Sequence, residues 1–536
     1  MKDLLDEKSV YKTIREDPTE KLQRKNNQIV NDLYKHKHID FNLKTKLHCS
    51  AAQPPKLYGL PKIHKENCPL RPISASTDVP CYNLAKYVGN IIKTLISTEL
   101  NIKNSFELKE KLQNQLIEND EILISYDVVS LFTNISTSLA IRIIMKRWDH
   151  LKNLTTIPKA QFQKILEFCL IENNYFKYNS LLYHQSFGMP MGNPLSPTIA
   201  DIVLDDLINY AKGRLEEEGI EIKMIYKYVD DMVAIVREKD NEKIIKILNE
   251  YHPKLKFTFE TESNQKLPFL DIMIHRDERK LIFNWYAKDI ASGRILNFNS
   301  AHTKPQKINT ANNLIEKIFR ISDKKFLQEN IHKIHSILHK NNYPHEIIND
   351  LINKHQNRSG HNANNNNDNI EQPIIYVGVQ YIPNLTDNKA LKSLIKQENI
   401  KFAHRPTETI IKLFTKTKDP TDKLQQHNVV YEIECAGGNG ENCNNTYIGT
   451  TKRALKTRIA EHKADFEKEK TTTALSQHLM TRKHTANFER VRILDRENNN
   501  NKRLTLESLR IQQKIETAMN SKEDKDKISL VYSVIL

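Results

Sequence analysis

The sequence is poor in cysteine and has neither a long apolar run nor an apolar leader. Its six cysteines, at positions 49, 68, 81, 169, 435 and 443, are too few for a disulfide framework in 536 residues, so a reducing, intracellular setting is expected. No run of about 18 apolar residues exists, and we therefore expect no membrane span and no membrane partner. Residues 1–17 are charged throughout and do not resemble a signal peptide.

Acidic residues are also too few to balance the basic ones. The 81 lysines and arginines exceed the 66 acids, which gives a net charge of +15 and a pI near 9.2. This balance favours a polyanionic partner, and nucleic acid is the obvious one. The content of 39% hydrophobic and 27% charged residues is typical of globular domains, and the length predicts three or four of them.

What the sequence does contain is a pair of adjacent acids between two apolar runs. Residues Tyr228–Asp231 lie between Met224–Ile225 and Met232–Val236, which predicts a strand, a tight turn and a strand with two carboxylates at the bend. Asp127 ends the apolar run 122–126, and we expect it to meet the hairpin across a sheet. Three converging carboxylates suit two Mg²⁺ ions that clamp the attacking and leaving oxygens of a phosphoryl transfer. The alternative is that these acids only solvate a turn and a strand end.

This arrangement resembles the active site of reverse transcriptases. The Tyr-x-Asp-Asp turn is similar to the hairpin of that family, and Asp127 matches its first palm aspartate. The resemblance implies that Phe132 excludes a 2′-hydroxyl from the incoming nucleotide, with core packing as the alternative. Residues 185–197, QSFGMPMGNPLSP, resemble the loop that grips template and nucleotide, in which small residues allow close backbone approach. Gln185 and Gly192 are its candidate nucleotide-binding residues, and a plain surface turn is the alternative.

A proline-rich stretch precedes these motifs. Its prolines, in residues 54–72, forbid a continuous helix and suggest a rigid platform for Lys62, Lys65 and Arg71, between basic helical stretches. These cations resemble the residues of the fingers that neutralise the triphosphate of the incoming nucleotide. A solvated basic loop is the alternative.

Two phrases resemble one branch of the family, the Penelope-like retroelements: YGLPKIHK at 58–65 and RILNFNSAH at 294–302. On that resemblance the chain is an RNA-directed DNA polymerase with a right-hand fold. Residues 1–120 would form an N-terminal segment and the fingers, 121–304 the palm and 305–355 a helical thumb. The implied partners are an RNA template, a DNA primer or target, and deoxynucleoside triphosphates.

The composition changes after the expected thumb. Residues 357–369, NRSGHNANNNNDN, cannot form a core and are predicted to be a flexible linker. A basic helical stretch that includes Lys401–Arg405 is expected next, which makes 356–427 an Asn-rich linker and basic connector. A small module of strands followed by helices, 428–536, completes an α+β chain.

The last module resembles GIY-YIG endonucleases, a small α/β fold. The triplets Val-Val-Tyr and Tyr-Ile-Gly stand in the places of the paired strand motifs, although valines replace the first two residues. The resemblance implies that Tyr431 and Tyr447 frame the reaction centre and that one phenol helps to deprotonate the attacking water. It also implies that Arg458 balances charge on the scissile phosphate, that His462 assists, and that Glu507 holds one Mg²⁺. The alternatives are a surface charge for Arg458 and a solvated helix residue for Glu507.

The same module contains a possible zinc set, Cys435, Cys443, His478 and His484. The spacing of the histidines fits structural zinc sites, but seven residues between the cysteines exceed the usual spacing. Because Penelope-like endonucleases resemble this chain in carrying a Cys-Cys-His-His set, we expect one structural Zn²⁺.

On these resemblances the protein is a reverse transcriptase coupled to an endonuclease that nicks the target and so primes integration. We expect synthesis in the cytoplasm and action in the nucleus, and the oligomeric state stays open. One alternative is a catalytically decayed, domesticated nucleic-acid-binding protein. Another is a telomerase-like or maturase-like host enzyme, although little chain precedes the fingers motif to hold the RNA-binding domain that a telomerase needs.

Overall fold

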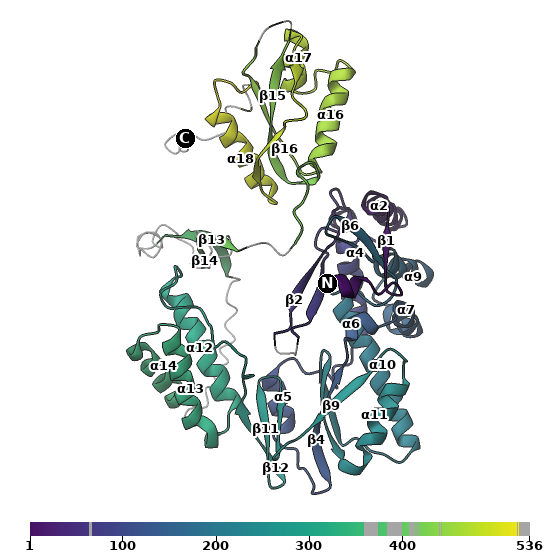
Figure 1. The fold of residues 1–536 in the computed structure, drawn as a ribbon, viewed down its shortest axis with the longest axis vertical. Coiled ribbons are helices and arrows are strands. Elements are labelled where there is room, and N and C mark those ends of the chain that lie inside the picture. Colours follow the sequence, from purple (N-terminus) through teal and green to yellow (C-terminus); the bar gives the residue numbers. More distant parts are fainter. Residues whose placement is uncertain are drawn as a thin grey trace.

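The computed structural model of the chain mixes helices and strands in several units (Figure 1). It describes residues 1–63, 67–358, 374–382, 399–406, 413–414, 418–438, 440, 442–521 and 524. Within these ranges, no helix combines the length and the apolarity that a membrane crossing requires.

A five-stranded sheet, the N-terminal sheet, contains segments that lie far apart in the sequence. Its strands follow the order β1 (Tyr11–Ile14), β6 (Leu181–Gln185), β5 (Tyr175–Tyr178), β2 (Lys56–Pro61) and β3 (Leu70–Ala75). The accompanying helices are α1 (Lys2–Leu5), α2 (Thr19–Lys35), α3 (Phe41–Leu47), α4 (Tyr82–Ile92) and α9 (Lys159–Glu167). Strands β5 and β6 therefore join the N-terminal part, although they fall in the range assigned to the palm.

The proline-rich stretch forms an antiparallel hairpin of β2 and β3 and not a loop. Leu57, Tyr58 and Ile73 favour strands, and β3 is the edge of its sheet. Pro72 is tolerated there because an edge position does not need its missing N–H group.

The central sheet is antiparallel, and both of its faces are covered. Its strands follow the order β7 (Met224–Tyr228), β8 (Asp231–Arg237), β4 (Glu121–Val128) and β9 (Phe257–Thr261). Met232 and Ala234 on one face share a core with helices α7 (Thr137–Lys146), α10 (Ser196–Glu217) and α11 (Asn241–Glu250). Val233 and Ile235 on the other face belong to a second core. Burial on both faces explains why β8 is an unbroken apolar run.

The second core lies between the central sheet and a smaller one. That sheet contains β10 (Lys266–Phe269), β11 (Ile272–Asp277) and β12 (Lys280–Trp285), with helix α5 (Ser105–Leu112) beside it. Residues Phe257–Glu260 lie in the central sheet, whereas Leu267–Phe269 belong to β10 of this smaller one. The remaining short helices are α6 (Leu131–Asn134) and α8 (Trp148–Leu151).

Three helices form a bundle with its own core in the range expected to be helical: α12 (Lys304–Ile321), α13 (Leu327–Lys340) and α14 (His345–Arg358). Thr303 begins α12 with a capping box closed by Gln306. Ile315, Ile334 and Ile348, one from each helix, are fully buried where the three helices meet.

The helix predicted around Lys401–Arg405 is wrong. Strands β13 (Ile375–Tyr381) and β14 (Ile400–Pro406) pair in parallel instead. Apolar and polar residues alternate through Ile400, Lys401 and Phe402, and this period of two fits a strand. Most of the Asn-rich linker, from residue 359 on, lies outside the described residues.

The C-terminal module has a sheet with helices on both faces. Its strands are β15 (Val429–Gly437), β16 (Thr446–Thr451), β17 (Thr485–Ala486) and β18 (Arg492–Arg496), and its helices are α16 (Leu455–Glu467), α17 (Ala474–Arg482) and α18 (Asn500–Gln513). Side chains of β15 alternate between a core shared with α16 and α17 and a core shared with α18.

The segment before this module contacts the N-terminal sheet. Lys56 donates from Nζ to the Asp419 carbonyl and to Thr421 Oγ1, both at 2.6 Å. Gln53 Nε2 donates to the Gln425 carbonyl at 2.8 Å.

Candidate functional site

The acidic hairpin is built as predicted. Tyr228 pairs with Asp231, which leaves Val229 and Asp230 as the turn between β7 and β8. Val229 has a φ of 57°, a conformation that β-branched residues rarely adopt. In the pairing of β4 with β8, Asp127 lies opposite Asp231. Residues that face each other in this way have Cα atoms about 4.5–5.5 Å apart, so the predicted convergence of the three acids is confirmed.

The three acids repel one another. Burial, followed by the charges of Asp230 and Asp127, raises the pKa of Asp231 to about 6. Lys288, from the segment after β12, acts in the opposite direction. Like charges held this close favour a divalent cation, which is bound by carboxylate oxygens and neutralises them.

A buried lysine supports the hairpin from behind, and the sequence prediction missed it. Lys227 immediately precedes Tyr228 and is fully buried. Its Nζ lies 2.9 Å from Asp201 Oδ1 and 3.2 Å from Asp205 Oδ1, both on α10. Asp205 also accepts a hydrogen bond from the Ser97 N–H at 2.7 Å. The ion pairs tie the hairpin to the helix that follows the loop 185–197. A lysine inside an apolar strand, with acids four residues apart on an apolar helix, was the signal available.

The loop 185–197 is held by close backbone contacts. A Cβ at Gly188 would lie 2.3 Å from the Thr133 carbonyl oxygen, and one at Gly192 would lie 2.0 Å from the Ser74 carbonyl oxygen. Both glycines have positive φ, 79° and 124°. Only glycine fits these positions. The loop therefore packs closely against the backbone of α6 and β3 and is not a plain surface turn.

The predicted nucleotide-binding residues lie in different settings. Arg71 is exposed on β3, and Lys62 is half-buried just after β2. Lys65 lies outside the described residues. Gln185 is buried and donates from its side chain to the Phe187 carbonyl at 2.9 Å, and this contact braces the loop. Phe132 packs against the large core, and its carbonyl accepts from the Met189 N–H at 2.7 Å.

Comparison with sequence families agrees with this geometry. Residues 63–270 match the reverse transcriptase (RNA-dependent DNA polymerase) family. The chain contains a reverse transcriptase domain. Residues 294–353, which include α12, α13 and most of α14, match the animal helix-turn-helix domain family. No curated protein sequence matches the chain significantly.

Several solved structures are distantly similar. Telomerase from Candida albicans, in complex with a fragment of telomeric RNA, is 9% identical, with 54% of this chain and 54% of that chain covered and a TM-score of 0.37. Telomerase from Candida tropicalis is 12% identical over 59% and 56%, with a TM-score of 0.35. The RNA-dependent RNA polymerase of BmCPV is 16% identical over 63% and 31%, also with a TM-score of 0.35. The chain thus spans about half of the first telomerase, and at these TM-scores we draw no inference from the likeness.

Outside the reverse transcriptase domain, the C-terminal module gathers the residues that the sequence singled out. Tyr431, on β15, is fully buried, and its Oη lies 2.8 Å from His462 Nε2. Arg458 Nε donates to the same oxygen at 3.2 Å. The Tyr447 ring lies edge-on to the His462 ring, with 5.4 Å between centroids. Gly449 leaves room for both tyrosines, because a Cβ there would lie 2.7 Å from Tyr431 Oη and 2.9 Å from the Tyr447 ring.

Burial determines the protonation of this group. Burial raises the pKa of Tyr431 far above its usual value, and burial also lowers the pKa of His462 to about 4. The phenol is therefore protonated and the imidazole neutral at pH 7, so Tyr431 donates its proton toward Nε2. Tyr447 is only half-buried, and Glu507 on α18 lies near enough for its charge to raise the pKa of both tyrosines.

Two further groups hold the strands of this site. Asn520 accepts from the Ile448 N–H at 3.0 Å and donates to the Ile448 carbonyl at 2.8 Å. On the opposite face of β15, the buried carboxylate of Glu432 pairs with Lys514 and with Arg492, the latter at 2.9 Å. The sequence prediction missed Glu432, whose only signal was an acid inside a buried strand.

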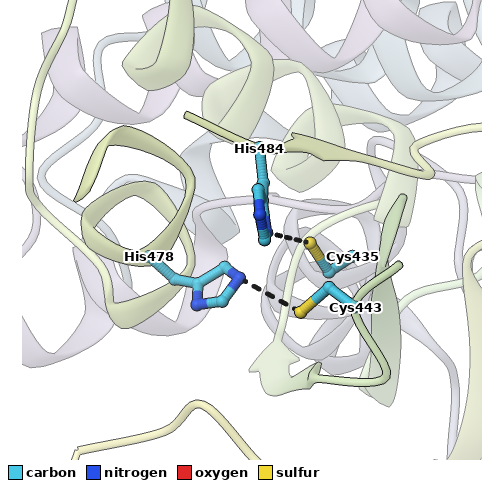
Figure 2. Close-up of side chains that lie close together, drawn as sticks. All are labelled: Cys435, Cys443, His478 and His484. Atoms are coloured by element: carbon cyan, nitrogen blue, oxygen red, sulfur yellow. Dashed lines mark hydrogen bonds between the residues drawn. The ribbon is translucent and has the colours of Figure 1, made fainter. Parts of the chain in front are cut away.

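The four predicted zinc ligands form a compact cluster (Figure 2). One ligand atom from each of Cys435, Cys443, His478 and His484 lies within 4.8 Å of all the others. Cys435 Sγ is 3.4 Å from His484 Nδ1, and Cys443 Sγ is 3.6 Å from His478 Nε2. Tetrahedral zinc with ordinary bond lengths separates a sulfur from a nitrogen ligand by about 3.6 Å, so these residues fit that metal. The Gly437 N–H also points to Cys435 Sγ at 3.4 Å, as a group supporting a thiolate ligand does.

Proposed function

We propose that the protein is the RNA-directed DNA polymerase of a Penelope-like retroelement, joined to a GIY-YIG endonuclease that nicks the target for primed integration. The observation that carries the polymerase is the register that puts Asp127 opposite Asp231 beside a turn containing Asp230, within the residues that match the reverse transcriptase family.

In this proposal each part of the reverse transcriptase domain has one task. Asp127, Asp230 and Asp231 hold two Mg²⁺, which when bound stabilise the attacking and leaving oxygens of nucleotidyl transfer. Lys62, Lys65 and Arg71 bind the triphosphate of the incoming nucleotide. The loop that contains Gly192 approaches base and sugar through its backbone, and the three-helix bundle serves as the thumb.

The partly exposed phenol is the better candidate to meet the attacking water in the C-terminal module. Tyr431 is fully enclosed, so its role is to orient Arg458 and to pass a proton toward the neutral His462. Tyr447 is half-buried, so it is less enclosed than Tyr431, and its ring lies beside the same imidazole. Arg458 then balances the developing charge on phosphate, and Glu507 holds one Mg²⁺, which when bound acts as a Lewis acid.

A structural zinc ion completes the module in this proposal. Cys435 is on β15 and His478 on α17, and Cys443 and His484 lie in the segments beside them, so one ion would tie strand, helix and loops together. Metal analysis of the full chain is expected to give about one zinc per chain, and a Cys435→Ser, Cys443→Ser variant is expected to give none. A zinc-free wild-type protein purified without chelators would contradict the assignment.

Two assays test the activities separately. Primer extension on an RNA template is expected to require Mg²⁺ and deoxynucleotides, and relaxation of a supercoiled plasmid is expected to report nicking. Binding of nucleic acid without either activity would favour the decayed, domesticated alternative. A telomerase-like or maturase-like host enzyme would instead extend DNA on a dedicated RNA, without nicking. Action in the nucleus after synthesis in the cytoplasm is part of the proposal.

A further inference from the structure

The parallel pair of β13 and β14 has two unlike faces. Its register pairs Tyr376 with Lys401, Gly378 with Ala403, and Gln380 with Arg405. Because side chains alternate along a strand, these six residues share one face. The opposite face carries the apolar side chains Ile375, Val377, Val379, Ile400 and Phe402, followed by His404 and Tyr381. Ile375 and Val377 are 52% and 40% exposed, so this face is only partly covered. The polar face carries the cations and is the one suited to a polyanion.

The polar face has two small residues at its centre, with a cation before and after them along β14. Gly378 and Ala403 are these small residues, and Lys401 and Arg405 are both exposed. The Arg405 guanidinium reaches over Gly378, since a Cβ there would be 3.5 Å from its Nε. Both cations therefore lie on this face, where they can contact the phosphates of one strand.

An exposed aromatic ring lies at one end of this polar face. The Tyr376 side chain is 66% exposed, opposite Lys401. An exposed ring beside cations on a flat sheet is the combination that stacks on unpaired bases while the cations track the backbone. A paired duplex hides the faces of its bases and offers no partner for the ring.

The sheet is attached to the three-helix bundle. Gln306 Nε2, in the first turn of α12, donates to the His404 carbonyl at 3.2 Å. In Figure 1 the strands lie at the end of the bundle, between it and the C-terminal module.

We infer that this polar face, formed by Tyr376, Gly378, Ala403, Lys401 and Arg405, binds a single-stranded nucleic acid. It is a binding site outside the reverse transcriptase domain and needs none of the proposed catalytic residues. The segment between the bundle and the C-terminal module is therefore a second contact with the strand and not only a spacer.

The test is equilibrium binding of a fluorescein-labelled 12-nucleotide single-stranded RNA to the full chain across a salt series. The protein carries Asp230→Asn and Asp231→Asn, so the result is independent of polymerase activity, which is measured separately on the wild type. Adding Lys401→Ala and Arg405→Ala is expected to reduce the slope of log affinity against log salt by about 1.4. Tyr376→Leu is expected to weaken binding at least about fivefold, and Tyr376→Phe to leave it unchanged.

Matched variants make the result decisive. Lys239→Ala with Lys243→Ala removes the same charge from exposed positions near α11 and is expected to leave the slope unaltered. An unchanged slope in the Lys401→Ala, Arg405→Ala variant would overturn the inference, as would equal weakening by Tyr376→Phe and Tyr376→Leu. The single-strand assignment also fails if only a blunt duplex loses affinity, or if an acidic peptide competes as well as the oligonucleotide.

Discussion

The central sheet and the C-terminal module each gather catalytic-type residues on paired strands, but they do so in opposite ways. On the central sheet, three acids converge, and burial together with mutual repulsion raises the pKa of Asp231. In the module, Tyr431 is fully enclosed and bonded to neutral and cationic partners. The negative charges of the first group are not balanced unless a cation binds, whereas the second group is held by its own hydrogen bonds. Activity and stability should therefore respond differently to mutation in the two places.

The sharpest contrast is expected from neutralising the acidic hairpin. Asp230→Asn with Asp231→Asn should lower primer extension by about 10⁴-fold or more, because these acids act as a unit and the double change removes the proposed Mg²⁺ site. The melting temperature should not fall, because the change removes repulsion from a site where the charged form of Asp231 is disfavoured.

Asp120→Asn is the matched control. This acid lies one residue before β4 with its side chain 70% exposed, and its loss should change neither quantity. Primer extension that survives in the double variant would refute the polymerase site.

For the ion pairs that support the hairpin, the main expected effect of mutation is on stability and not on activity. Lys227→Met leaves Asp201 and Asp205 without their buried partner and should cost about 3–5 kcal/mol of unfolding free energy. Adding Asp201→Leu and Asp205→Leu should restore most of it. Denaturant unfolding measures both, with the exposed Lys239→Met as control. A stable single variant would show that the ion pairs do not hold the hairpin.

In the module, acid should weaken the fold through His462. The folded state takes up the proton at a pKa of about 4, but the unfolded state does so near 6.5. The unfolded state thus binds more protons between these values, so stability is complete above pH 6.5 and falls as the pH drops toward 4, by up to about 3 kcal/mol. Hydrogen exchange of β15 amides should show this loss of stability, and His462→Gln should remove the pH dependence of the stability. An identical pH profile in that variant would assign the effect elsewhere.

The smallest expected effects separate the two tyrosines. Tyr447→Phe should slow plasmid nicking about 100-fold if its phenol meets the water, and Tyr431→Phe about tenfold, since it loses only orientation and proton relay. Tyr343→Phe, which removes a buried hydroxyl from the three-helix bundle, should leave nicking unchanged. The reverse order would exchange the two roles.

Local patterns in the sequence predicted most of the elements that carry chemistry. The hairpin at Tyr228–Asp231 and the strand before Asp127 follow from apolar runs around acids, and the helical region 305–355 was expected from the family resemblance. The roles of Lys227 and Glu432 were not predicted, because a buried charge is compensated by partners that are distant in sequence. The strand Ile400–Pro406 was mistaken for a helix, since its basic residues favour helices over strands and its partner residues lie 25 positions earlier, from Ile375 paired with Ile400.

The nine residues of strand β15 contribute side chains to three different groups in the module. Tyr431 faces one layer, Glu432 the other, and Cys435 reaches the metal-type cluster near its end. A deletion or insertion of one residue here would exchange the two layers at once, because the side-chain period of a strand is two. The length of this strand should therefore be almost invariant.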